Sequence, residues 1–324
     1  MQGHENNAAI FGINDLMNHQ LKNISASIHQ RLLNKARETK RPFNELLQYY
    51  AMERFLYRLS RSSHAEKFIL KGALMLSVWK ASAQRPTRDI DLLGRIKNNI
   101  TVLSDVTKKI CIQKVEQDGL VFDPVSIAGE HITEDADYAG VRIRFRGSLG
   151  NARIAMQIDV GFGDVIFPSW KVVEYPTILD LPAPRLRGYS RETMIAEKFE
   201  AMVKLGILNS RMKDFYDIWL LSRQFDFGGR TLSMAIEKTF HKRGTVIPLQ
   251  MEDLKKTLTQ EAAKETQWRG FIRKNRLIDV PETFNDLITA VIAFLVPIAK
   301  ALVAGGSCSK IWKAPGPWSN EGRG

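Results

Sequence analysis

The sequence predicts an α/β fold, with a mixed sheet in the middle of the chain, helices before it and a helical C-terminal half. Residues 141–146 and 153–160 alternate apolar and polar side chains, as strands with one packed and one polar face do. Apolar side chains recur at spacings of three and four residues before residue 60 and beyond residue 190, as on amphipathic helices. Strands flanked by helical segments on both sides indicate an α+β arrangement.

The first two thirds of the chain should hold the helices and strands of this sheet. Helices are expected over about residues 20–60, where Pro42 is suited to starting a new helix. Residues 73–79 predict a short helix, residues 104–113 a further helix and residues 120–127 a strand. Turn residues at 147–151 predict that the two alternating strands form a hairpin.

A connecting stretch with four prolines precedes the helical half. Ser190 can cap a helix that runs through Leu205, and a second helix should start near Ser210. Further helices are expected at 231–241, 251–265, 267–275 and 282–303. We therefore divide the chain into an N-terminal helical segment (1–60), a sheet-containing core (61–185) and a helical C-terminal domain (186–324).

One apolar segment, Leu287 to Gly305, could be mistaken for a membrane span. It contains Pro297 and Lys300, and its largest side chains recur at three and four residues. That stripe is typical of a buried or amphipathic helix, so we expect no membrane interaction.

Charge and cysteine content narrow the class of partner and the compartment. The formal net charge of +12 favours a polyanionic partner, with nucleic acid first. The two cysteines, Cys111 and Cys308, provide neither a disulfide framework nor a zinc knuckle. The first residues show no signal-peptide pattern, and we expect a cytoplasmic protein.

The strongest chemical signal is the pair Asp89 and Asp91. Side chains two residues apart on a strand share a face and lie roughly 7 Å apart. Such carboxylates repel each other unless a cation lies between them, and Mg²⁺ prefers carboxylate and phosphate oxygens. Gly72, just upstream of a short helix, suits phosphate binding. The pattern predicts a site for Mg²⁺ and a nucleoside triphosphate, although solvated aspartates at a strand end would look the same.

A third carboxylate would complete such a site or act as a base. Asp159 is the acid on the polar face of a well-patterned strand, although it could instead pair with Arg142 or Arg144. Asp164 is the alternative, and it could instead stabilise a turn.

A second charged group lies in the helical half. Arg211, Asp214 and Asp217 recur at three residues and should line one helix face, while Lys198 lies on the preceding helix. These residues could form a solvated ion pair. In the functional interpretation, Lys198 and Arg211 approach phosphates while Asp214 orients Lys198 or the acceptor.

Four motifs, in order, resemble the AbiEii/AbiGii toxin family of nucleotidyltransferases. They are residues 68–74 (FILKGAL) with 85–94 (RPTRDIDLLG), 158–164 (IDVGFGD), 196–201 (AEKFEA) and 211–217 (RMKDFYD). The closing segment, Trp312 to Trp318, is also similar, and the resemblance extends from about residue 30 to the end.

The resemblance implies a polymerase β-like catalytic core and a toxin of a toxin–antitoxin or abortive-infection (phage-defence) system, with a cognate antitoxin of the AbiEi type. MenT-type relatives transfer nucleotides to the 3′ end of tRNA. By motif, the resemblance implies that Asp89 and Asp91 hold Mg²⁺, with Asp159 as our third metal ligand, and that Asp214 completes the catalytic site. The nucleotide-binding residues would be Lys71, Gly72, Ala73, Arg88, Lys198 and Arg211. Ala73 stands where the wider superfamily often has glycine or serine, so a hydroxyl contact to phosphate is lost.

The predicted function is therefore Mg²⁺-dependent nucleotide transfer from a nucleoside triphosphate to RNA, with the tRNA 3′ end as the acceptor. Two alternatives stay open. One is a nucleotide-binding toxin without turnover, and the other is a nucleotidyltransferase that modifies small molecules such as antibiotics. The net charge disfavours the latter, since a cationic aminoglycoside would call for an acidic cleft.

Overall fold

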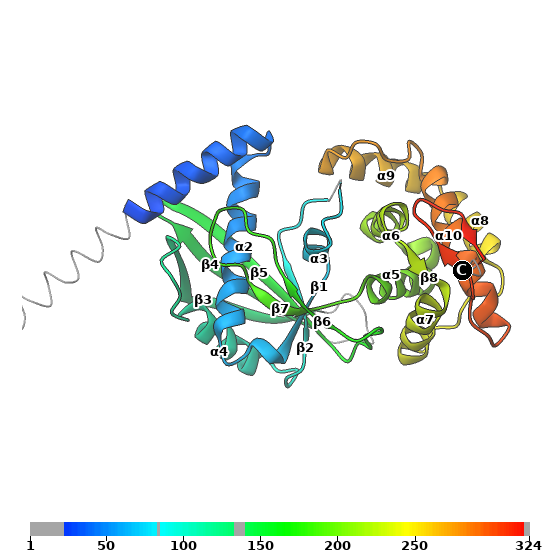
Figure 1. The fold of residues 1–324 in the computed structure, drawn as a ribbon, viewed down its shortest axis with the longest axis horizontal. Helices are drawn as coiled ribbons and strands as arrows, with labels where there is room; N and C mark the ends of the chain where they lie inside the picture. The colour runs from blue at the N-terminus through cyan, green and yellow to red at the C-terminus, as the bar shows by residue number, and fades with distance from the viewer. Residues whose placement is uncertain (1–22, 83–84, 133–139, 321–324) are drawn as a thin grey trace, which may run out of the picture. The chain divides into compact units, whose positions relative to one another are not determined.

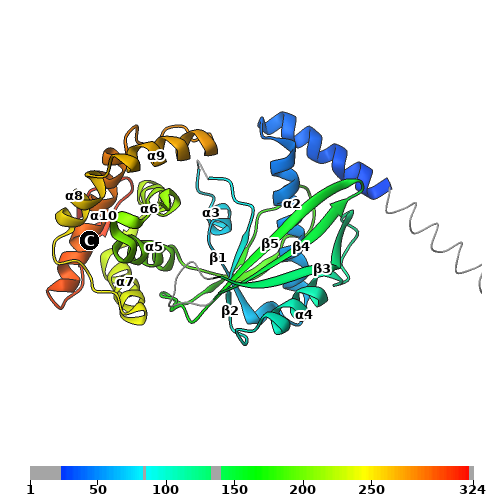
Figure 2. The same cartoon turned by 180° about the vertical axis from the view of Figure 1, so that it is seen from behind.

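The computed structural model describes residues 23–82, 85–132 and 140–320 and confirms the mixed α/β class (Figures 1 and 2). The chain forms two compact units that interleave along the sequence. Unit 1 comprises Met1–Leu70, Thr87–Phe162 and Val172–Arg187, and unit 2 comprises Lys71–Pro86, Gly163–Lys171 and Gly188–Gly324. The division into three consecutive segments, 1–60, 61–185 and 186–324, stays a prediction.

Unit 1 is built on a seven-stranded mixed sheet with the strand order β3-β4-β5-β2-β1-β7-β6. Strands β3, β4 and β5 pair antiparallel, whereas β2 runs parallel to β5. Besides a helix over residues 23–39, its elements are α2 (Phe43–Arg61), the 3₁₀ turn η1 (Ala65–Lys67), β1 (Phe68–Lys71), β2 (Ile90–Gly94), α4 (Ile100–Cys111), β3 (Leu120–Ile132), β4 (Gly140–Leu149), β5 (Ala152–Phe162), β6 (Lys171–Glu174) and β7 (Arg185–Gly188).

The predicted alternation separates a packed from a polar face of this sheet. Ile154, Met156 and Ile158 are buried, as are the apolar residues of β4. Phe55 of α2 contacts the rings of Phe122 and Phe145, so α2 covers the apolar face, as Figure 1 also shows. The opposite face carries the charged side chains of β3, β4 and β5.

The hairpin is confirmed, but its link is shorter than expected. Strand β4 continues to Leu149, and only Gly150 and Asn151 form the turn. Gly150 has φ of 56°, a left-handed conformation that glycine adopts without a steric penalty. Gly147 is part of the strand, where its missing side chain leaves room for the Phe122 ring.

Unit 2 is mainly helical. Its elements are α3 (Leu74–Val78), α5 (Arg191–Leu205), η2 (Gly206–Leu208), α6 (Met212–Gln224), β8 (Phe227–Gly228), α7 (Gly229–Arg243), α8 (Met251–Thr259), α9 (Ala262–Asn275), α10 (Phe284–Val303), β9 (Ile311–Trp312) and β10 (Trp318–Ser319). The hydroxyl of Ser190 accepts a hydrogen bond from the Thr193 backbone N–H and caps α5, as predicted.

One helix expected over residues 251–265 is instead divided between α8 and α9. Leu258 and Lys264 are both buried, at 0% and 3% exposure. On a continuous helix these positions would point about 120° apart, and the break near residue 260 allows both to face inward.

The apolar segment near the C-terminus forms α10, which packs against α6, α7 and α8. By length and composition α10 could cross a membrane, and 44% of its most apolar window is buried in the structure. The core helix of a helical bundle has the same length and apolar composition. The buried residues of α10 recur at three and four residues, as expected for the predicted buried or amphipathic helix.

Candidate active site

Three aspartates converge on the polar face of the unit 1 sheet. Asp91 lies on β2 and Asp159 on β5, directly opposite each other in the parallel pairing, while Asp89 immediately precedes β2. One carboxylate oxygen from each residue lies within 4.8 Å of the others. The strand pairing therefore brings together residues that are 68 positions apart in the sequence.

Neighbouring polar groups hold two of these carboxylates in place. The Thr87 hydroxyl donates to Asp89, and the Thr87 backbone N–H donates to the Tyr49 hydroxyl of α2. On Asp159, both oxygens accept from Arg142, with Nε to Oδ1 at 2.8 Å and Nη2 to Oδ2 at 2.7 Å. Asp159 therefore lies in the acidic cluster and is also paired with Arg142, and its role as a metal ligand stays a prediction.

The cluster suits a hard divalent cation. All three aspartates are partly exposed, so a cation can reach them from solvent. Oxygens around an octahedral Mg²⁺ lie about 3 to 4 Å apart, so small side-chain movements would bring these three into range. Three carboxylates are the oxygen-donor set that such an ion prefers.

Lys198 is the centre of a buried ion network in unit 2. Its Nζ lies 2.8 Å from Asp214 Oδ1 and 2.8 Å from Asp217 Oδ2, and its side chain is 12% exposed. Arg85 donates to both oxygens of Asp217 at 3.0 Å. Arg211, at the start of α6, lies with its Nε 2.9 Å from Asp214 Oδ2. The predicted contact between Asp214 and Lys198 is therefore present.

Electrostatics keeps this network charged. Burial alone would raise the pKa of Asp214, but Lys198 and Arg211 outweigh it and hold the pKa below its usual value. Burial likewise opposes the charge on Lys198, yet Asp214 and Asp217 raise its pKa above the usual value. Lys198, Asp214, Asp217 and Arg211 therefore stabilise one another within the folded chain, independently of any bound nucleotide.

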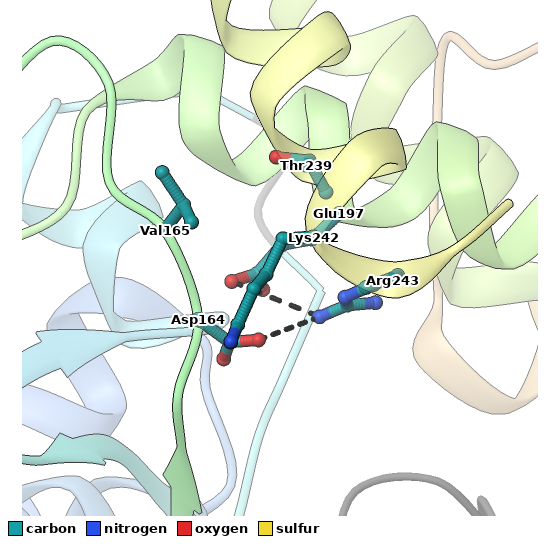
Figure 3. Close-up of a pocket in the computed structure, with 6 residues that line it drawn as sticks. All are labelled: Asp164, Val165, Glu197, Thr239, Lys242 and Arg243. Carbon is teal, nitrogen blue, oxygen red and sulfur yellow. Dashed lines mark hydrogen bonds and ion pairs between the residues drawn. The ribbon is translucent and has the colours of Figure 1, made fainter.

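A second network surrounds Lys71, which ends β1. Its Nζ lies 2.6 Å from Asp164 Oδ2 and 3.1 Å from Glu197 Oε2. Arg243 of α7 contacts Asp164 at 2.9 Å and Glu200 at 2.7 Å. Figure 3 shows Arg243 directed toward Asp164 and Glu197 in a shallow hollow that Thr239 and Lys242 also line.

The sequence patterns did not predict the part of this network formed by Glu197, Glu200 and Arg243. Burial, with the neighbouring Asp164, raises the pKa of Glu197. The only sequence signal was the spacing of Glu197 and Glu200, which places both on one face of α5. Asp164, the alternative third metal ligand, is engaged by Lys71 and Arg243, and the acidic cluster contains Asp159.

The remaining predicted nucleotide-binding residues lie as follows. Gly72, between β1 and α3, has φ of 68°, and Ala73 has helical dihedral angles. Arg88 is exposed beside Asp89. Lys71, Gly72, Ala73, Lys198 and Arg211 belong to unit 2, whereas the three aspartates belong to unit 1. Their assignment to nucleotide binding stays a prediction.

Comparison with known proteins identifies the family. Residues 54–290 match the model of the family described as "Nucleotidyl transferase AbiEii toxin, Type IV TA system". The four motifs lie inside this range, and the closing tryptophan segment lies outside it. No curated protein matches the chain.

Two crystal structures from Helicobacter pylori resemble the fold. One, named for a candidate nucleotidyltransferase, is 14% identical with a TM-score of 0.48, covering 80% of this chain and 96% of that one. The other, JHP933, has the same identity and TM-score, covering 81% and 94%. This likeness is too distant to add to the assignment, which depends on the family match. Since that match spans well over half of the sequence, the chain belongs to the AbiEii family of toxin nucleotidyltransferases of type IV toxin–antitoxin systems.

Proposed function

We propose that this nucleotidyltransferase uses Mg²⁺ held by Asp89, Asp91 and Asp159 to transfer nucleotides from a nucleoside triphosphate to RNA, at the 3′ end of tRNA. The observation that carries the proposal is the convergence of three carboxylates, within 4.8 Å of one another, in a chain of this family. When bound, Mg²⁺ would neutralise charge on the triphosphate.

In the proposed reaction, an RNA hydroxyl oxygen forms a bond to the α-phosphorus, the bond to the leaving pyrophosphate breaks, and the hydroxyl proton is released. Asp89 and Asp91 provide oxygen ligands, and Thr87 keeps Asp89 oriented. Asp159, with both oxygens bound by Arg142, is better suited to holding a ligand in position than to accepting a proton.

The cations of unit 2 have a supporting role in the proposal. Lys71 and Lys198 are each bound by two carboxylates, so a phosphate would have to share them. Arg88 is an exposed residue, and the side chain of Arg211 is 38% exposed, so both are more accessible than the two lysines. We propose that Arg88, which precedes Asp89 in unit 1, contacts phosphate directly, and that within unit 2 Asp214 positions Lys198.

Positive charge supports RNA as the acceptor. The exposed positive charge lies at the end of α9, and not on the arginine row of β4. The arginine row of β4 is neutralised, because Arg142, Arg144 and Arg146 pair with Asp159, Glu130 and Asp123. Exposed basic residues at the end of α9 (Arg273, Lys274 and Arg276) are better candidates for phosphate contacts. The choice of tRNA rests on the family resemblance.

The family also implies an antitoxin as the functional partner of this toxin and a nucleoside triphosphate as its substrate. We propose that the protein acts in the cytoplasm, where nucleoside triphosphates and tRNA are available.

The test is incubation of the protein and Mg²⁺ with total tRNA and each α-labelled nucleoside triphosphate in turn. Label that enters tRNA, and is absent with Asp89→Ala, supports the proposal. Label in a small molecule or protein, with tRNA unmodified, would favour another acceptor. If the Asp89→Ala and Asp91→Ala variants remain toxic to cells, a toxin that acts by binding alone is favoured.

A further inference from the structure

The polar face of the unit 1 sheet carries a row of charges that crosses four strands. Glu130 of β3 is the register partner of Arg142 of β4, which is opposite Asp159 of β5, which is opposite Asp91 of β2. Register partners share a face of the sheet and lie about 5 Å apart. Arg142 therefore places a cation next to the acidic cluster, on the side of Asp159 away from Asp91.

The contact between Arg142 and Asp159 is stronger than an ordinary surface pair. Nε and Nη2 of Arg142 each contact a different oxygen of Asp159, at 2.8 and 2.7 Å, in the fork geometry that matches a carboxylate. The two side chains are only 20% and 15% exposed, so water screens them less than it screens the neighbouring pair of Arg144 and Glu130, at 52% and 50%. The Gln157 amide adds further contacts to Asp159 at 3.2 and 3.3 Å.

These contacts limit what Asp159 can offer to a cation. A carboxylate has about four lone-pair sites, and the guanidinium and the amide engage most of them. The cluster also carries less charge than its three acids suggest, because the guanidinium offsets one of the three negative charges.

We propose that Arg142 is a positioning residue that restricts the acidic cluster to one divalent cation in the absence of nucleotide. Arg142 supplies the positive charge that a second cation would otherwise supply and keeps Asp159 turned toward β4. This inference rests on the proposed metal-binding role of the three aspartates.

The expected effect on cation affinity follows from Coulomb's law. A cation held by the cluster would lie within several ångströms of the guanidinium. Even at the dielectric constant of water, a single and a double charge about 6 Å apart repel each other enough to weaken binding about tenfold. Removing the charge of Arg142 should therefore tighten binding of the first cation by at least about tenfold and permit a second.

The experiment is a Mn²⁺ titration of the full chain without nucleotide, with free Mn²⁺ counted by electron paramagnetic resonance and displaced by Mg²⁺. Wild type should bind one Mn²⁺ at the Mg²⁺-displaceable site. Arg142→Gln should bind the first ion at least about tenfold more tightly and take up a second. Arg142→Lys, which keeps the charge but not the fork, should retain the wild-type stoichiometry.

The matched control is Arg153→Gln, an exposed arginine six residues along β5 from Asp159 and about 20 Å away. Its Mn²⁺ binding should equal that of wild type. Circular dichroism verifies that each variant is folded, and the wild-type stoichiometry tests the inference even if Arg142→Gln does not fold.

Three results separate the possible failures. Two displaceable ions in wild type, or unchanged binding in Arg142→Gln, would overturn the inference and leave the proposed function intact. Equal gains in Arg142→Gln and Arg142→Lys would overturn the charge argument. Absence of any displaceable Mn²⁺ in wild type and in Arg142→Gln alike would overturn the metal site itself.

Discussion

Replacing Lys198 with alanine should destabilise the protein as well as affect catalysis. Lys198 lies 2.8 Å from each of two buried carboxylates, Asp214 and Asp217, which are 1% and 0% exposed. Removing one partner of a buried ion pair leaves an uncompensated charge and costs about 3–5 kcal/mol. Arg85 still neutralises Asp217 through two hydrogen bonds. The uncompensated buried charge in the variant is therefore mainly that of Asp214.

The lower end of that range is therefore expected, a loss of about 3 kcal/mol in the free energy of unfolding at pH 7. Arg211 can offset part of it, but its side chain is 38% exposed and its charge is screened by water. The assay is urea denaturation followed by circular dichroism. Lys256→Ala, an exposed lysine of α8, is the control and should stay within about 0.5 kcal/mol of wild type.

The pH dependence of the loss provides a second test. In wild type the pKa of Asp214 is held low, because Lys198 and Arg211 outweigh the effect of burial. Its charged form therefore contributes stability above the unfolded pKa, and that contribution is lost as pH falls toward the folded pKa. Without Lys198, burial should raise the pKa of Asp214, so protonation relieves the buried charge. The difference between Lys198→Ala and wild type should then shrink from pH 7 to pH 5.

A variant as stable as wild type at pH 7 would refute this reasoning. A loss that stays constant between pH 7 and pH 5 would show that lost packing, and not the unpaired Asp214, causes it.

For catalysis, Lys198→Ala should raise the apparent KM for the nucleotide. Lys198→Arg should restore it only partly, since a guanidinium fork does not replace a point charge.

Three further predictions concern the sheet and the acceptor. Asp89→Ala and Asp91→Ala should each abolish transfer and relieve growth inhibition without unfolding the chain, whereas Asp105→Ala, an exposed acid on α4, should do neither. RNA affinity should fall by orders of magnitude between roughly 50 and 200 mM salt if six or more phosphates are contacted, and a flat titration in a filter-binding assay would argue against RNA. Burial raises the pKa of Glu53 to about 7, so its contribution to stability is present below its unfolded pKa and lost as pH rises through 7; thermal melts between pH 6 and 8 should show this loss in wild type and not in Glu53→Gln.

Local pattern was sufficient for much of the fold. The alternation along residues 141–146 and 153–160 predicted β4 and β5, because neighbouring side chains of a strand face opposite sides of the sheet. Ser190 predicted the start of α5, because a capping hydroxyl acts on the N–H three residues ahead. These patterns depend on residues close in sequence, so they predict a strand or a helix start without knowledge of the rest of the fold.

The composition of the acidic cluster needed the tertiary structure. From the sequence alone, Asp159 and Asp164 were both possible third carboxylates. The parallel pairing of β2 with β5 places Asp159 opposite Asp91, and no local pattern specifies the register between strands so far apart in the chain. Asp164 instead meets Lys71 and Arg243, which come from other elements.

The partners of charged side chains were likewise decided by packing. Periodicity alone predicted that Arg142, Arg144 and Arg146 form a row on one face of a strand, and that Lys198 and Asp214 lie on successive helices. The pairing of each arginine of the row with an acid, and the burial of Lys198 between two carboxylates, are visible only in the folded chain. Periodicity states which face a side chain occupies, whereas burial and ion pairing depend on which distant segment packs against that face.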